Sequence, residues 1–131
     1  MRYLLDTNAV IILLNDARSK LAVRVRREKP VDIVMSAIVA HELFYGAFKS
    51  QRVTKNLALL DALQFAIVEF DKEDARRAGE LRAILAAEGA PIGPYDALVA
   101  GQAMARNLIL VTHNTSEFER VPGLRIEDWQ I

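Results

Sequence analysis

Short apolar runs alternate with longer helical patterns along the whole chain. Each run is rich in leucine, isoleucine or valine and is bounded by polar residues, which predicts strands buried within a sheet. The stretches between the runs carry the apolar spacing and the capping residues of helices. The predicted strands are Tyr3–Asp6, Val31–Met35, Phe65–Phe70 and Leu108–Thr112, with a possible short fifth at Leu124–Ile126. The predicted helices are Ala9–Asn15, Ser19–Lys29, Ala37–Ser50, Val53–Leu63, one from the cap Asp71 to Glu88, and one from Pro94 to Arg106.

This alternation predicts an α/β fold, because parallel neighbouring strands need a crossover connection between them. We expect a three-layer α/β/α sandwich with a central, mainly parallel sheet of four to five strands. No internal repeat, linker or biased segment divides the sequence, so residues 1–131 are expected to form a single domain. In such sheets, ligands bind beyond the carboxyl ends of the strands, and that edge is where we look for chemistry.

The composition narrows the class of protein. Hydrophobic residues make up 52% and charged residues 26% of the chain, which excludes a disordered or low-complexity protein. The absence of cysteine excludes a disulfide framework, a thiolate zinc site and a cysteine nucleophile. The longest apolar run, Ala9–Leu14, is too short to cross a bilayer, and the N-terminus has no signal-peptide pattern. These features favour a soluble cytoplasmic protein that does not associate with a membrane.

The formal net charge of zero conceals an uneven distribution. Residues 1–55 contain ten Lys or Arg against five acids, whereas residues 56–131 contain seven against twelve. A neutral total taken alone argues against a nonspecific nucleic-acid binder, which is usually basic. Because the two parts cancel, the total says little about any one surface.

Polar side chains gather where two of the predicted strands end. Asp6-Thr7-Asn8 follows the first strand, and Thr112-His113-Asn114 follows the fourth. The carboxyl ends of parallel strands meet at one edge of a sheet, so these two clusters are candidates for a site. Asp6 on its own is better explained as the cap of a following helix.

Glu42 is the acid that folding alone explains least well. It lies within one helical turn of Ile38 and Val39, and no basic residue is one turn away to pair with it. A carboxylate at such a position loses hydration without a compensating partner. A structural and a functional role both remain open on this ground.

Two further acids complete the candidate set. Asp96 is the third residue of its predicted helix, where it also favours the helix dipole, and Glu117 by itself has the pattern of a surface loop. Several carboxylates at one sheet edge would repel one another unless a cation neutralised them. Oxygen ligands without cysteine or paired histidines select Mg²⁺, or alternatively Mn²⁺, over zinc. Such sites mostly serve phosphoryl chemistry.

Four motifs in register resemble PIN-domain ribonucleases and, more narrowly, the VapC toxins of bacterial type II toxin–antitoxin modules. The resemblance runs from Tyr3 to Trp129. The motifs are Leu4-Leu5-Asp6-Thr7-Asn8, His41-Glu42-Leu43-Phe44-Tyr45-Gly46-Ala47, Pro91-Ile92-Gly93-Pro94-Tyr95-Asp96, and Val111-Thr112-His113-Asn114 followed by Glu117-Phe118-Glu119-Arg120-Val121-Pro122-Gly123-Leu124.

The resemblance implies a PIN-domain fold and a magnesium-dependent endoribonuclease. By position, Asp6, Glu42 and Asp96 correspond to the three core acids that bind metal and act in catalysis. Glu117 fills the fourth acidic place, where Asn114 is the neutral alternative and is expected to assist. Thr7, Asn8 and Thr112 are expected to orient carboxylates and water. His113 stands where relatives often have Asn, and a hydrogen-bonding role at the strand end is favoured over a catalytic one.

The implied mechanism is in-line attack of water on a phosphodiester, which leaves 5′-phosphate and 3′-hydroxyl ends. The subgroup with Pro-Ile-Gly-Pro-Tyr-Asp is similar to toxins that inhibit translation by cutting tRNA in the anticodon stem-loop, initiator tRNA among them. Seven basic residues are candidates for RNA contact, although a solvated helix face explains them equally well: Arg24, Arg26, Arg27, Lys29, Lys49, Arg52 and Lys55.

Proteins of this kind form homodimers, bind a small VapB antitoxin and assemble into higher VapBC hetero-oligomers, which the resemblance leads us to expect here. Two other readings stay open at this point. One is a PIN-domain nuclease that acts in RNA processing outside a toxin–antitoxin system. The other is a catalytically silent PIN-like binding module, against which the intact set of acids argues.

Overall fold

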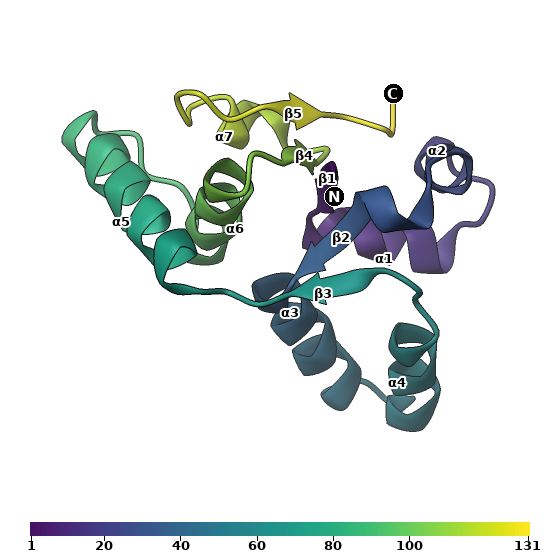
Figure 1. Ribbon diagram of the computed structural model, residues 1–131. Coiled ribbons are helices and arrows are strands. Elements are labelled where there is room, and N and C mark those ends of the chain that lie inside the picture. Colours follow the sequence, from purple (N-terminus) through teal and green to yellow (C-terminus); the bar gives the residue numbers. More distant parts are fainter.

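The computed structural model describes residues 1–131 and contains a five-stranded, entirely parallel sheet flanked by helices (Figure 1). The strand order is β3-β2-β1-β4-β5. The strands are β1 (Tyr3–Leu5), β2 (Ile33–Ser36), β3 (Ala66–Val68), β4 (Ile109–Val111) and β5 (Ile126–Glu127). The helices are α1 (Thr7–Asn15), α2 (Lys20–Arg27), the 3₁₀ turn η1 (Pro30–Asp32), α3 (Ala37–Phe48), α4 (Val53–Asp61), α5 (Lys72–Ala87), α6 (Pro94–Ala105) and α7 (Thr115–Phe118).

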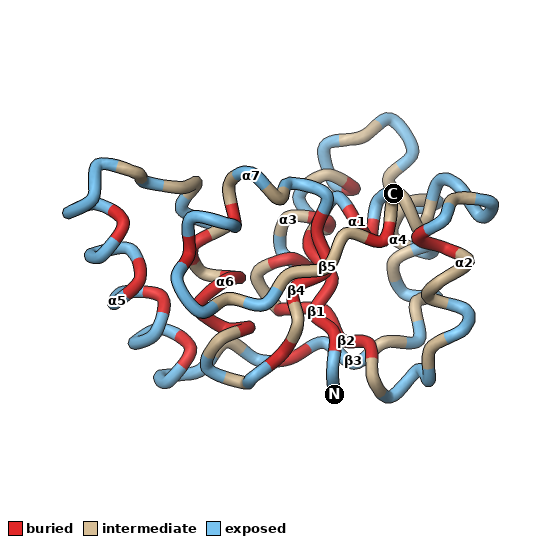
Figure 2. Tube along the Cα trace, turned by 90° about the horizontal axis from the view of Figure 1, so that it is seen from above, coloured by how far each residue is buried: buried red, intermediate tan, exposed pale blue.

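The sheet separates two groups of helices. Figures 1 and 2 both place α5 and α6 on one side of the strands and α1, α2 and α4 on the other. Right-handed crossovers account for this arrangement, because the chain moves outward from β1 to β3 and then returns across β1 to β4. The predicted α/β/α sandwich with a parallel sheet is therefore confirmed. No helix is both long and apolar enough to span a membrane.

The core is centred on β1, whose three residues are all buried. Burial is concentrated in the central strands and on the sheet-facing sides of the helices (Figure 2). The close packing of α5 on α6 depends on Gly101, because a Cβ atom there would lie 2.5 Å from the Cα of Ala78. Polar groups also join these two helices, since the Gln102 amide donates to the buried Asp74 carboxylate over 3.0 Å.

The element boundaries differ from the predicted ones where side chains or proline decide them. The first helix begins at Thr7 rather than Ala9, because the Asp6 side chain caps it. Strand β2 begins at Ile33 rather than Val31, because the preceding residues, starting at Pro30, form the 3₁₀ turn η1. The short helix α7 was not predicted. In the fifth strand, Ile126 pairs with Leu110, and this strand begins two residues later than the predicted start at Leu124.

Candidate active site

The pairing of β1 with β4 brings two polar residues to the same edge of the sheet. Leu5 lies opposite Val111, so Asp6 and Thr112 follow side by side at the carboxyl ends of their strands. The backbone N–H of Asp6 donates to the Val111 carbonyl over 3.1 Å, which continues the ladder by one bond. The Asp6 side chain is buried and accepts the Ala9 N–H over 2.8 Å. Asp6 is thus a helix cap and also lies where a site was predicted.

Glu42 joins this edge from α3. The helix starts directly after β2, with the Ser36 hydroxyl accepting the Ile38 N–H over 3.0 Å. Glu42 is half-buried, and its Oε1 accepts a hydrogen bond of 2.9 Å from the Thr7 hydroxyl. The partner of Glu42 is therefore a hydroxyl from α1 and not a basic residue, and this contact fixes the carboxylate next to the start of α1.

Asp96 and Glu117 meet around Gly93. Asp96 lies in the first turn of α6, for which Gly93 is the N-cap, and Glu117 lies in α7. The Gly93 N–H donates to Glu117 Oε1 over 2.8 Å, and the Asn114 amide donates to the other oxygen of Glu117. A Cβ at Gly93 would lie 3.2 Å from Asp96 Oδ2 and 3.7 Å from Glu117 Oε1. Glycine at this position therefore leaves room for both carboxylates.

The protonation of these acids reflects their crowding. Desolvation by burial, followed by the charge of Glu117, raises the pKa of Asp96 to about 7, and Glu42 and Asp6 add to the rise. Burial also raises the pKa of Asp6, while the Thr112 hydroxyl and the Ala9 N–H offset part of the effect. The four predicted acids are thus near enough to repel one another.

The donor set fits a hard divalent cation in its chemistry, because all four side chains offer carboxylate oxygens and their mutual repulsion would be relieved by a positive ion. The side chains as they stand do not form a group of three or more ligands around one point. Hydrogen bonds hold two of these carboxylates in place, Glu42 through Thr7 and Glu117 through Gly93 and Asn114.

The polar residues near the acids hold one another in place. The Thr112 hydroxyl accepts the Asn114 backbone N–H over 3.0 Å, which shapes the turn after β4. His113 is exposed, and its Nδ1 lies 2.9 Å from Asp128 Oδ2. Asn8 is exposed on α1 and lines a shallow pocket together with His113 and Asn114. His113 is accordingly a hydrogen-bonding residue at the strand end, as expected.

Two contributors to the site were not predicted from the sequence. Gly93 was part of a quoted motif, but its contact with Glu117 depends on the fold. Asp128, directly after β5, contributes to the raised pKa of Asp6 and orients His113. Asp128 could have been proposed from the sequence, because it closely follows the fifth predicted strand and β5 ends at the same edge of the sheet as β4.

Arg24 differs from the other predicted RNA contacts. Its guanidinium lies 4.5 Å from the centre of the Trp129 ring and pairs with Glu28 over 2.9 Å and with Glu127 over 3.5 Å. These contacts tie Arg24 to the packing of the C-terminal segment and pair its charge, and RNA contact by Arg24 stays a prediction. The remaining six are exposed: Arg26, Arg27, Lys29, Lys49, Arg52 and Lys55.

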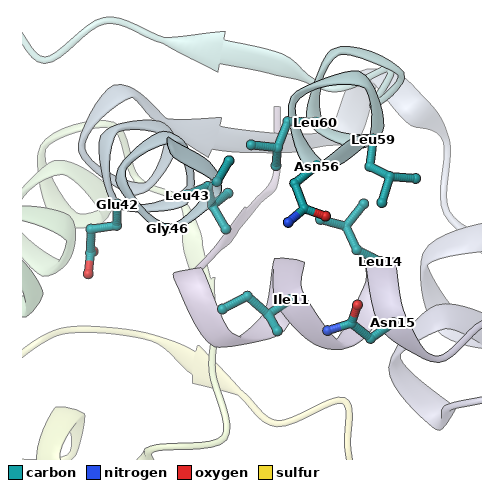
Figure 3. A pocket seen from close by; sticks show the side chains of 10 residues that line it. Ile11, Leu14, Asn15, Glu42, Leu43, Gly46, Asn56, Leu59 and Leu60 are labelled. Atoms are coloured by element: carbon teal, nitrogen blue, oxygen red, sulfur yellow. The ribbon is translucent and has the colours of Figure 1, made fainter. Parts of the chain in front are cut away.

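An apolar groove runs beside Glu42 between α1, α3 and α4 (Figure 3). It encloses about 220 Å³. In Figure 3, Ile11 and Leu14 line it from α1 and Leu59 and Leu60 from α4, while Glu42 lies at one end with its carboxylate turned away from the leucines. The groove therefore leads from an apolar surface toward the carboxylates.

Comparisons with known proteins agree with this fold. The model of the PIN domain family matches residues 3–124. The chain is 39% identical to the tRNA(fMet)-specific endonuclease VapC of Shigella flexneri over 131 residues, covering 98% of each protein. In the crystal structure of DNA-bound VapBC from Salmonella typhimurium, a chain 38% identical superposes with a TM-score of 0.94, covering 98% of both chains. In VapBC2 from Rickettsia felis bound to a promoter DNA fragment, a chain 34% identical gives a TM-score of 0.90, covering 98% of this chain and 99% of that one.

Proposed function

The chain belongs to the PIN-domain family, and within it to the VapC ribonucleases, and on that premise we propose that it is a Mg²⁺-dependent endoribonuclease toxin of a type II toxin–antitoxin module. Nucleases of this family generally use divalent metal ions. The observation that carries the proposal is the convergence of Asp6, Glu42, Asp96 and Glu117 on one sheet edge, where burial and then the charges of the other three acids raise the pKa of Asp96.

These four acids would hold the ion, with Mn²⁺ as a possible substitute. A bound divalent ion would supply an acidified water and neutralise charge on the attacked phosphodiester. Thr7 orients the Glu42 carboxylate, while Gly93 and Asn114 position Glu117. Asp6 stays fixed by the start of α1. The contribution of the chain is thus to bring oxygen ligands to one edge of the sheet, and the products are expected to carry 5′-phosphate and 3′-hydroxyl ends.

We propose that the substrate is tRNA cut in the anticodon stem-loop, with initiator tRNA the first candidate. The similarity to an endonuclease specific for tRNA(fMet) supports this choice. Unpaired bases in a loop are accessible to protein side chains, whereas the base edges in the deep major groove of an A-form helix are not. Cleavage of initiator tRNA would inhibit translation in the cytoplasm.

A VapB-type antitoxin is the expected partner, and a homodimer and higher VapBC hetero-oligomers are the expected assemblies. The apolar groove between α1, α3 and α4 supports this, because a segment of the antitoxin lying in it would reach the carboxylates beside Glu42. Such a segment would block the site by covering it. Apolar side chains for this contact are provided on both sides of the groove.

Expression in a bacterial host tests the proposed function. We expect wild-type protein to arrest growth, Asp6→Asn and Asp96→Asn variants to permit it, and a cognate VapB-type antitoxin to restore growth to cells that express the wild type. Sequencing of RNA 5′ ends after brief induction should locate the cut in the anticodon loop of initiator tRNA. Equal arrest by all three proteins, or 2′,3′-cyclic phosphate ends on the products, would show that the proposal is wrong.

A further inference from the structure

The exposed aromatic rings of this protein gather in one place. The chain contains five Phe, three Tyr and one Trp, and only Tyr45, Phe48 and Tyr95 are exposed. Their exposed fractions are 61%, 64% and 48%. Solvent-exposed aromatic side chains that cluster in this way mark an interaction surface, whereas isolated ones need no explanation.

This surface adjoins the carboxylate site. His41 directly precedes Glu42 on α3, and Tyr95 directly precedes Asp96 on α6. The rings of His41 and Tyr95 are 5.8 Å apart between centroids and are tilted by 58°. The two side chains therefore bridge the helices that carry two of the four acids.

The surface continues along α3 away from the site. His41, Tyr45 and Lys49 are spaced by four residues and so share one face of the helix, and Phe48 lies three residues beyond Tyr45. The Lys49 ammonium lies 4.8 Å from the centre of the Tyr45 ring, within cation–π range. We call this set, His41, Tyr45, Phe48, Lys49 and Tyr95, the aromatic strip.

We propose that the aromatic strip stacks unpaired bases of the RNA next to the scissile phosphate, an inference that rests on the proposed ribonuclease function. Base–aromatic stacking binds single-stranded nucleic acid without needing a particular sequence, and a lysine beside the ring attracts the phosphate backbone. The acids repel a polyanion, so substrate affinity has to come from groups outside the metal ligands. The strip is the aromatic surface that begins beside those acids.

Charge favours RNA over a second copy of the chain as the occupant. A two-fold symmetric contact through this face would place the same patch of both copies together. The Lys49 ammonium would then lose hydration against a patch that contains no acidic residue to pair with it. A polyanion complements this ammonium group.

The test measures RNA binding by Tyr45→Leu and Tyr95→Leu, which remove a ring but keep an apolar side chain. The matched controls are Tyr45→Phe and Tyr95→Phe, which keep the ring, and Ile84→Ala, an exposed residue of α5. All variants are made in an Asp6→Asn background with Mg²⁺ present. The probe is a single-stranded oligoribonucleotide with one 2-aminopurine, followed by anisotropy for affinity and by fluorescence quenching for stacking.

Each leucine variant should bind the oligonucleotide about 5- to 100-fold more weakly and lose quenching, while the phenylalanine and Ile84 controls bind like the parent. In otherwise wild-type protein, the leucine variants should raise KM for RNA cleavage with little change in kcat. Unchanged affinity and quenching in both leucine variants would overturn the proposal. A lower molecular mass of the leucine variants, measured by light scattering, would also overturn the proposal, because it would assign the aromatic strip to contacts between copies of the chain.

Failure of this proposal is distinguishable from failure of the proposed function. If the wild-type protein cuts RNA and the leucine variants bind and cut it equally well, the proposed ribonuclease function stands and the proposed role of the aromatic strip is wrong. If the wild-type protein cuts no RNA, the proposed ribonuclease function is wrong. Binding is measured separately from cleavage, so the stacking result is obtained in either case.

Discussion

Asp96 and Glu117 face each other around the backbone of Gly93, although one lies at the start of α6 and the other in α7. The backbone N–H of Gly93 holds Glu117, and the missing side chain of Gly93 leaves room for Asp96. A single residue thus positions two acids that the sequence could only place separately.

Gly93→Ala should impair catalysis without unfolding the protein. The new Cβ would press against Asp96 Oδ2 at 3.2 Å, so the carboxylate must shift by a few tenths of an ångström. Misplacement of a reacting group on this scale costs about ten- to a hundredfold in rate. Steady-state cleavage assays alongside circular dichroism would measure both properties. A variant as active as the wild type would show that this spacing does not matter.

Asp96→Asn should abolish cleavage and yet stabilise the metal-free protein. Folding raises the pKa of Asp96 from 3.8 to about 7, so the folded state binds this proton more tightly than the unfolded chain does. Ionisation of Asp96 therefore destabilises the metal-free fold progressively as the pH rises from about 4 to about 7. Asparagine cannot ionise and avoids this loss.

Thermal unfolding in EDTA would measure this effect. At pH 8 the Asp96→Asn protein should melt about 2 °C or more above the wild type, and the difference should vanish near pH 4. A lower melting temperature for the variant at pH 8 would contradict the proposed repulsion among the acids.

Mg²⁺ and protons should compete for the site. Because a ligating carboxylate must be ionised, the apparent affinity for Mg²⁺ should fall about tenfold per pH unit below about pH 7, where Asp96 becomes protonated. Isothermal titration calorimetry at pH 6, 7 and 8 would follow both the affinity and the released proton. Affinity that does not change over this range would mean that Asp96 is not a ligand.

Thr7→Val should reduce activity through Glu42. The substitution keeps the size and β-branching of the side chain and removes the hydroxyl that donates to Glu42 over 2.9 Å. We expect a loss of about tenfold in kcat, as is typical for removing a partner that orients a metal ligand. Thr7→Ser retains the hydroxyl and should keep most of the activity. Equal rates for both variants would exclude an orienting role.

Asp74 provides the contrast of an acid that serves folding. It is buried between α5 and α6 and accepts hydrogen bonds from Gln102 and Arg106. Asp74→Ala removes the buried carboxylate that both donors share, leaves the Glu69 carbonyl as their remaining common acceptor, and should cost about 2–4 kcal/mol in the free energy of unfolding. The exposed neighbour Glu73 serves as control, since Glu73→Ala should change stability little. Urea denaturation measures both, and below the melting temperature cleavage by both variants should match the wild type.

The sequence predicted local features well and distant contacts poorly. Alternating apolar runs and caps such as Asp71 identified the elements, because these signals act over a few residues. Asp6 and Asp96 could be proposed since strand ends and helix starts converge in parallel sheets. The roles of Gly93, Asp128 and Arg24 depend on contacts between segments far apart in the chain, which a periodic pattern does not encode.

The central claim is that the four converging acids form the site of a metal-dependent ribonuclease. The most direct measurement incubates purified protein with initiator tRNA, with Mg²⁺ or with EDTA, and analyses the ends of the fragments. We predict cleavage in the anticodon loop by the wild type with Mg²⁺ alone, giving 5′-phosphate and 3′-hydroxyl ends, and no cleavage by Asp6→Asn or Asp96→Asn. Cleavage that persists in EDTA, or that both variants perform at the wild-type rate, would contradict the account.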